Sequence, residues 1–65
     1  MSTAKVIELL AEGATLEEAV NSAVAEAAKT VRGIRSVYLD GIQAIVEKDK
    51  VVRYRVNAKV TFVLE

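Results

Sequence analysis

The chain of 65 residues contains no cysteine, histidine, proline or tryptophan. The absence of cysteine excludes disulfides, thiolate metal sites and cysteine nucleophiles. The absence of histidine removes the side chain that most often acts as a general base, and with it every histidine-based triad. No nucleophile paired with a base can be identified among the remaining side chains, so we expect a protein that is not an enzyme.

An excess of charge of one sign is also missing, because nine Lys and Arg residues balance nine Asp and Glu residues. Without a basic excess to neutralise phosphates, nucleic acid is not an expected partner. No apolar run approaches the ~20 residues that span a membrane, and the first residues lack the apolar core of a signal peptide. We therefore expect a cytoplasmic protein that does not insert into membranes.

Hydrophobic residues make up 52% of the sequence, which is a high fraction for so short a chain. A domain of this size buries only about 60% of the surface that its unfolded chain exposes, so a single-chain core is marginal. Disulfides are excluded, and the scattered carboxylates have no metal-ligand spacing. We therefore expect residues 1–65 to form one domain that is stabilised by self-association.

The residue pattern predicts that the chain begins with a strand and a helix. The apolar, β-branched segment Lys5–Leu10 is typical of a strand. Thr15 and Glu18 have the spacing of a capping box, which indicates the start of a helix. Apolar residues three or four apart continue the helix to about Arg32, and Gly33 suits a left-handed stop.

Two segments of period 2 follow, at about Ser36–Glu47 and Val52–Leu64, and they predict a hairpin with the two-residue loop Lys48-Asp49. In that register Gln43 lies opposite Tyr54 on the apolar face. The other face would carry Ser36, Tyr38 and Asp40 beside Thr61, Lys59, Asn57 and Arg55, with an apolar patch of Ile42, Ala44, Val46 and Val63. The expected fold is α+β with the order β-α-β-β, a three-stranded antiparallel sheet wrapped around one helix.

Most of the sequence resembles the dodecins, a family of small bacterial and archaeal proteins. The likeness is carried by Lys5–Leu9, Thr15–Val20, Ala28–Arg32, Lys50–Val56 and Lys59–Glu65. The resemblance implies a hollow homododecamer with helices outside and sheets inside. It also implies that flavins (riboflavin, FMN or FAD) stack in pairs between tryptophans of neighbouring subunits, with a glutamine bonded to the ring. The implied role is flavin storage or sequestration.

The sequence departs from the flavin-binding dodecins at the positions that contact flavin. The stacking tryptophan falls on Ser36, the ring-binding glutamine on Arg55 and the turn glycine on Asp49. Tyr38 points to the same side of the strand as Ser36 and is the candidate stacking ring. Arg55 is the candidate donor to a carbonyl or an anionic group. Gln43 is a further candidate donor, although its predicted place on the apolar face indicates a buried hydrogen bond or a bulge.

Each candidate also has a purely structural interpretation. Tyr38 would pack at a symmetry axis, and Arg55 would pair with Asp40 across the two strands. Without the family tryptophan, the alternative function is a dodecin-like shell that does not bind flavin. Such a shell would serve as a structural assembly, or it would hold another anionic ligand such as coenzyme A, or a metal ion.

Overall fold

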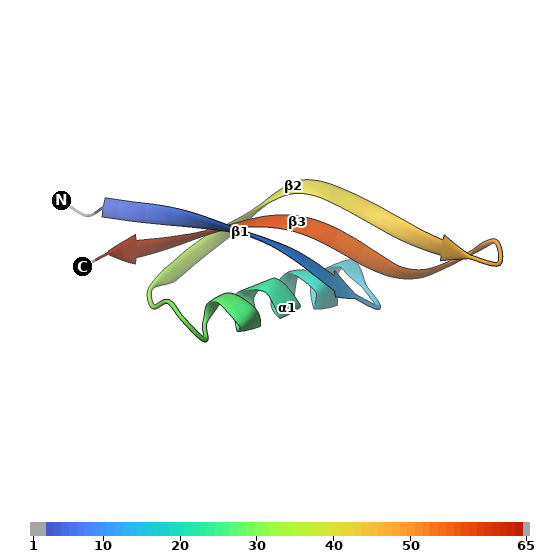
Figure 1. Ribbon diagram of the computed structural model, residues 1–65, viewed down its shortest axis with the longest axis horizontal. Coiled ribbons are helices and arrows are strands. Elements are labelled where there is room, and N and C mark those ends of the chain that lie inside the picture. The colour runs from blue at the N-terminus through green and yellow to red at the C-terminus, as the bar shows by residue number, and fades with distance from the viewer. Residues whose placement is uncertain (1–2, 65) are drawn as a thin grey trace.

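The computed structural model describes residues 3–64, which form three strands and one helix (Figure 1). Their order is β1 (Thr3–Gly13), α1 (Leu16–Ala27), β2 (Ile34–Glu47) and β3 (Lys50–Leu64). β3 is the central strand and pairs antiparallel with β1 on one side and β2 on the other. The expected α+β fold is confirmed, and each strand is longer than the sequence pattern predicted.

The helix packs against one face of the sheet through alanine side chains. Ala19, Ala23 and Ala27 lie four residues apart on one side of α1, and all three are buried. Ala19 and Ala23 meet Val56 and Ala58 of β3 in the core. Because alanine ends at Cβ, the helix lies close to the sheet. Within residues 3–64, no helix is long and apolar enough to cross a membrane.

The start of the helix agrees with the predicted capping. Thr15 Oγ1 accepts a hydrogen bond from the Glu18 backbone N–H at 3.1 Å. The Glu18 carboxylate reaches back to the Ala14 backbone N–H, also at 3.1 Å, one residue before the position expected. Two donors at the helix N-terminus are satisfied in this way.

The predicted end of the helix at Arg32 is wrong, because α1 stops at Ala27. The Thr30 N–H bonds to the carbonyl of Ala27 three residues back, which tightens the chain into a turn. β-Branched residues at this point also lower helix propensity. Gly33 does adopt the expected left-handed conformation, with φ of 77°, but it leads into β2 instead of ending α1.

The β2–β3 hairpin has the predicted loop but not the predicted register throughout. The pairs from Ser36 to Leu39 and the two pairs next to the loop agree with the prediction, whereas a further irregularity between Ile34 and Ser36 places Ile34 opposite Phe62. Between the two sets of pairs that agree, irregularities at Asp40 in β2 and Val52 in β3 shift the pairing by one residue, so that Gln43 lies opposite Arg55 and not Tyr54. Because each strand has one extra residue, Asp40 in β2 and Val52 in β3, the second shift reverses the first and restores the predicted pairing. Side-chain alternation alone therefore could not reveal them.

The shift moves several side chains to the opposite face of the sheet. Gln43 joins Arg55 on the face away from the helix, so its predicted place on the apolar face is wrong. The alternative prediction of a bulge is confirmed by the irregularity between Leu39 and Gly41. Ile42 and Ala44 move the other way, opposite Val56 and Tyr54. The prediction of these two residues on the uncovered face is likewise wrong, although Ile42 stays 53% exposed.

The extended hairpin makes the chain elongated, with dimensions of 51 × 19 × 13 Å. Its radius of gyration is 13.3 Å, compared with about 11 Å for a compact domain of this length. Among the described residues, only three buried side chains are larger than alanine, whereas nine large apolar side chains are exposed. These nine are Val6, Leu10, Leu16, Tyr38, Ile42, Val46, Val51, Val52 and Leu64. A surface of this kind favours association with further copies.

The hairpin loop offers a test of the backbone conformation. Lys48 and Asp49 have φ of 52° and 65°, so both occupy the left-handed region of a type I′ turn. A residue with a side chain costs about 1 kcal/mol in this region relative to glycine. We expect Asp49→Gly to raise the free energy of unfolding in urea by about 1 kcal/mol. Asp49→Ala, which keeps Cβ, should give no increase; an equal gain in both variants would contradict this explanation.

Candidate functional site

The face of the sheet opposite the helix, called the open face below, carries all four predicted site residues. β3 supplies the middle side chain of each row across the sheet, and β1 and β2 supply its neighbours. From the end of β3 toward the hairpin loop, successive rows are Val6–Thr61–Ser36, Glu8–Lys59–Tyr38, Leu10–Asn57–Gly41 and Glu12–Arg55–Gln43.

The predicted residues form two separate groups on the open face. Gln43 and Arg55 are direct cross-strand partners. Tyr38 lies beyond the irregularity in β2, two rows from Arg55, and Ser36 lies one row further. Two rows correspond to about 13 Å between Tyr38 and Arg55 at about 3.3 Å per residue. The ring of Tyr38 is 64% exposed and is accessible for stacking. One chain therefore does not bring the candidate ring and the candidate donors together.

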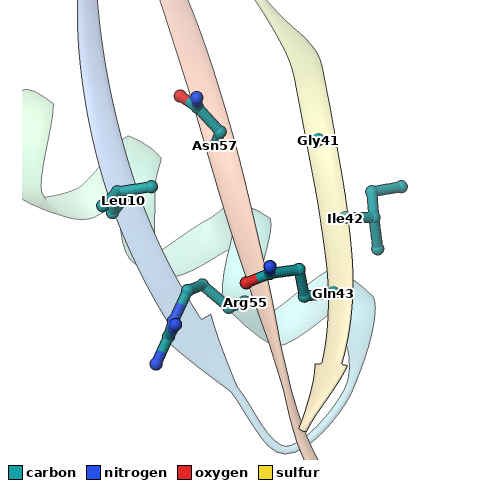
Figure 2. Close-up of a pocket in the computed structure, with 6 residues that line it drawn as sticks. All are labelled: Leu10, Gly41, Ile42, Gln43, Arg55 and Asn57. Carbon is teal, nitrogen blue, oxygen red and sulfur yellow. The ribbon is translucent and has the colours of Figure 1, made fainter.

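A hollow of about 290 Å³ lies on the open face where Gly41 leaves space opposite Asn57 (Figure 2). It is lined by Leu10, Gly41, Ile42, Gln43, Arg55 and Asn57. Its volume is near the lower limit for small-molecule sites. A larger hollow of about 480 Å³ lies between the α1–β2 turn and the end of β3, but none of the predicted site residues lines it.

Asn57 is a polar residue of this hollow that the sequence did not reveal as a candidate. Its amide oxygen Oδ1 is buried and has no hydrogen-bond partner among residues 3–64. A buried acceptor left unpaired costs about 1–3 kcal/mol. The signal in the sequence would have been the glycine opposite it, but that pairing depends on the irregular register. Asn57 thus lines the hollow together with Gln43 and Arg55, with its Oδ1 enclosed by the chain.

Two arginines of β3 are held by one carboxylate of β1. Arg53 Nε donates to Glu12 Oε1 at 2.9 Å, and Arg55 Nε donates to Glu12 Oε2 at 2.8 Å. Arg53 Nη1 also donates to Glu47 Oε2 at 3.5 Å. Among residues 3–64, the Arg55 guanidinium makes its side-chain hydrogen bond through Nε, to Glu12, and its two terminal nitrogens make none. The guanidinium is therefore oriented by Glu12 and keeps donors for a ligand.

The expected ion pair between Arg55 and Asp40 is wrong. Asp40 is the extra residue in the irregular part of β2, and its carboxylate pairs with Lys59 at 3.4 Å. Both groups are partly exposed, so this pair contributes little to stability. No group of three or more metal-ligating side chains is found among the described residues, so this part of the chain gives no support to a metal site.

The ion pairs of Glu12 lead to a pH-dependent prediction. Hydrogen bonds, first from Arg55 and then from Arg53, hold the pKa of Glu12 below its ordinary value of 4.5. A carboxyl whose pKa is lowered by folding stabilises the fold above pH 4.5, and this contribution is lost as the pH falls through the folded-state pKa. The difference in unfolding free energy between the parent and Glu12→Gln should therefore shrink below pH 4.5. Urea denaturation between pH 7 and pH 3 measures it, and a constant difference would contradict the ion pairs.

The fold and the open face define a class of small β-α-β-β proteins in which one helix covers one side of a three-stranded sheet and leaves the other side uncovered. The sequence model of the Dodecin family matches residues 3–65. The chain therefore belongs to the dodecin family, and the resemblance seen in the sequence is confirmed.

Solved dodecin structures share this fold over almost their whole length. A mutant of Thermus thermophilus dodecin is 30% identical with a TM-score of 0.89, and the match covers 100% of this chain and 98% of that chain. Dodecin from Streptomyces coelicolor is 26% identical with a TM-score of 0.87, covering 98% and 93% of the two chains. Dodecin from Streptomyces davaonensis is 15% identical with a TM-score of 0.86, covering 98% and 96%, and shows the fold alone. No curated protein matches the sequence.

Proposed function

We propose that this protein is a homododecameric binding protein that holds a flavin, namely riboflavin, FMN or FAD, for storage or sequestration. Membership of the dodecin family supports the ligand class. The observation that supports the place of binding is the hollow beside Gln43 and Arg55, on a sheet face that the helix leaves uncovered. The proposed role is binding without catalysis, in which the protein shields the flavin ring.

The separation of the two groups of residues indicates how the site is completed. Tyr38 and Arg55 of one chain are about 13 Å apart along the strand, too far to hold one part of a flavin ring together. We therefore place the ligand between two copies. Tyr38 of one copy stacks on the ring, and Gln43 and Arg55 of a neighbouring copy donate hydrogen bonds to its carbonyls.

The strength of binding tests this arrangement. Stacking of a planar ring on one aromatic side chain contributes about 1–3 kcal/mol in nucleic-acid complexes, and tyrosine offers less area than tryptophan. We expect a dissociation constant for riboflavin in the micromolar range or weaker, measured by quenching of flavin fluorescence. Ser36→Trp should bind at least tenfold more tightly, which requires about 1.4 kcal/mol. Tyr38→Ala should abolish binding, whereas Tyr38→Phe, which keeps a ring, should retain it.

A second candidate function is favoured by Ser36, which stands where the family places its stacking tryptophan. A shell that does not bind flavin would be a structural assembly or would hold another anionic ligand. If riboflavin, FMN and FAD fail to bind both the parent and Ser36→Trp, the flavin proposal is wrong. Titration with coenzyme A then distinguishes an anion-binding shell from a purely structural one.

A further inference from the structure

Four charged side chains form a continuous row of ion pairs across the open face. Glu47 Oε2 accepts a hydrogen bond from Arg53 Nη1 at 3.5 Å, and Glu12 Oε1 accepts one from Arg53 Nε at 2.9 Å. The second oxygen of Glu12 accepts a hydrogen bond from Arg55 Nε at 2.8 Å. These four residues are called the ion chain below. They come from all three strands, so the ion chain joins β1, β2 and β3 at one place.

The ion chain lies where the sheet narrows from three strands to two. The pairing of β1 with β3 ends at Gly13 and Tyr54. The residues beyond that row, 45–53 and called the arm below, form a ribbon of two strands that extends past the end of β1 (Figure 1). Arg53 belongs to the arm, whereas Glu12 belongs to the three-stranded part. Their hydrogen bond therefore ties the arm to the rest of the sheet.

A bulge at the base of the arm leaves its direction adjustable. The pairing of β2 and β3 is irregular between Ile45 and Val46, where Val52 is the extra residue of β3. A bulge bends the strand that carries it, and ribbons of two strands twist more than wider sheets. Glu47 lies on the loop side of this bulge and Arg53 lies on the other side. Their hydrogen bond therefore spans the bulge and restrains the bend.

The direction of the arm matters because the arm carries an apolar contact surface. Val46, Val51 and Val52 are 58%, 52% and 42% exposed in the single chain. In the proposed assembly these side chains are covered by neighbouring copies. Only chains whose arm points toward the neighbouring copy are able to make this contact, so the affinity between copies falls with the fraction of such chains.

We infer that the ion chain holds the arm in the direction that self-association requires, and that the strength of assembly therefore depends on Glu12, Arg53 and ionic strength. The inference rests on the proposed function, because it concerns contacts within the homododecamer. The side chains of Glu12 and Arg53 are each 39% exposed, so dissolved salt screens their attraction. When the ion chain is broken or screened, the arm samples other directions and fewer chains are ready to assemble.

Removal of the charge of Glu12 tests the inference. Glu12→Gln keeps the length of the side chain, and it should raise the protein concentration at which half of the assembly dissociates by about fivefold, a factor within the range of two partly exposed ion pairs. Light scattering over a dilution series in a fixed, non-denaturing concentration of urea measures this concentration. Circular dichroism of the same samples checks that the variant keeps its fold.

Asp40→Asn is the matched control. It also removes a carboxylate from an exposed ion pair of the sheet, because Asp40 pairs with Lys59 at 3.4 Å, but this pair lies within the three-stranded part. Its half-dissociation concentration should stay within about twofold of the parent. Arg53→Gln should weaken assembly as much as Glu12→Gln. The double variant should be no weaker than either single variant, because both residues act through one set of contacts.

The response to salt is a second measurement, and for the parent it depends on no substitution. Between about 0.05 M and about 0.5 M NaCl, the half-dissociation concentrations of the parent and of Asp40→Asn should rise about fivefold, because screening at the higher concentration weakens exposed ion pairs. Glu12→Gln has already lost the ion chain, so its half-dissociation concentration should change by less than about twofold.

The outcomes distinguish this inference from the proposed function. If Glu12→Gln assembles as tightly as the parent, if Asp40→Asn weakens assembly equally, or if salt does not weaken the parent, the role of the ion chain is overturned while the homododecamer stands. If the parent is monomeric at every concentration, the homododecamer and the role of the ion chain are both overturned. An equal weakening in Glu12→Gln and Arg53→Gln, matched in the parent by high salt, supports the inference.

Discussion

A Val46→Asp variant is expected to lose its assembly and most of its folded structure together. Val46 is 58% exposed in the single chain and lies opposite Val51 near the end of the hairpin. In the proposed dodecamer this apolar end of the hairpin is covered by neighbouring copies. An unpaired charge buried there costs several kcal/mol, and the cost recurs in every copy.

Light scattering and circular dichroism measure this result. The parent should have a mass of about 84 kDa, as expected for twelve chains of 7.0 kDa. Asn21→Asp is the matched control, because it adds the same side chain at an exposed position of α1 and should leave both mass and spectrum unchanged. A Val46→Asp protein that still assembles would show that Val46 is not at a subunit contact. A stable folded monomer of the parent at micromolar concentration would overturn the dodecamer itself.

The coupling of folding to assembly follows from the small core of one chain. Among residues 3–64, the buried side chains larger than alanine are Val56, Val60 and Phe62. Burial of such side chains contributes about 1.5–3 kcal/mol each. This is small beside the conformational entropy of ordering a chain of this length. Contacts between copies are therefore expected to supply a large share of the stability.

The order of the elements could be predicted because local patterns determine it. Thr15 caps the helix within its own turn, and the two-residue loop at Lys48-Asp49 sets the hairpin from residues adjacent in sequence. The end of the helix was less predictable. Apolar spacing continues through Val31, but the chain tightens into a turn after Ala27. Gly33 accepts a backbone hydrogen bond from Val63 of β3, and this contact competes with continuation of the helix.

The candidate site was predictable only where it depended on the hairpin alone. Arg55 and Tyr38 were assigned to the correct face, but the irregularity at Asp40 reversed the face of Gln43. The pairing of Glu12 with Arg55 depends on how β1 aligns with β3, and no short loop fixes that register. Glu12 therefore could not be predicted from the sequence as the hydrogen-bond partner of Arg53 and Arg55.

The pairing of Glu12 with Arg55 also explains how an arginine is accommodated on the open face. An uncompensated guanidinium on the open face would favour anions. Glu12 of β1 lies opposite Arg55 of β3, and its Oε2 accepts a hydrogen bond from Arg55 Nε at 2.8 Å. Glu47 pairs with Arg53 at 3.5 Å, so two carboxylates balance the two arginines of this cluster.

Gly13→Ala is expected to lower the free energy of unfolding by about 3 kcal/mol, because the end of β1 touches the first turn of α1. A Cβ atom at Gly13 would overlap the backbone nitrogen of Ala19 and would lie 2.7 Å from the carbonyl carbon of Glu18. Neither is a side-chain atom that can rotate away. The helix would have to move off the strand, which opens the close packing of Ala19 on the sheet.

Gly41→Ala is the matched control for this prediction. A Cβ atom at Gly41 would meet Asn57 Cβ at 3.9 Å, an ordinary van der Waals contact. Its unfolding free energy should therefore stay within about 0.5 kcal/mol of the parent, as is usual for surface substitutions. The same methyl group enters the hollow of the open face, so ligand binding should weaken although the fold is intact. Urea unfolding of the two variants decides the matter, and equal stabilities would mean that β1 and α1 are not in contact at Gly13.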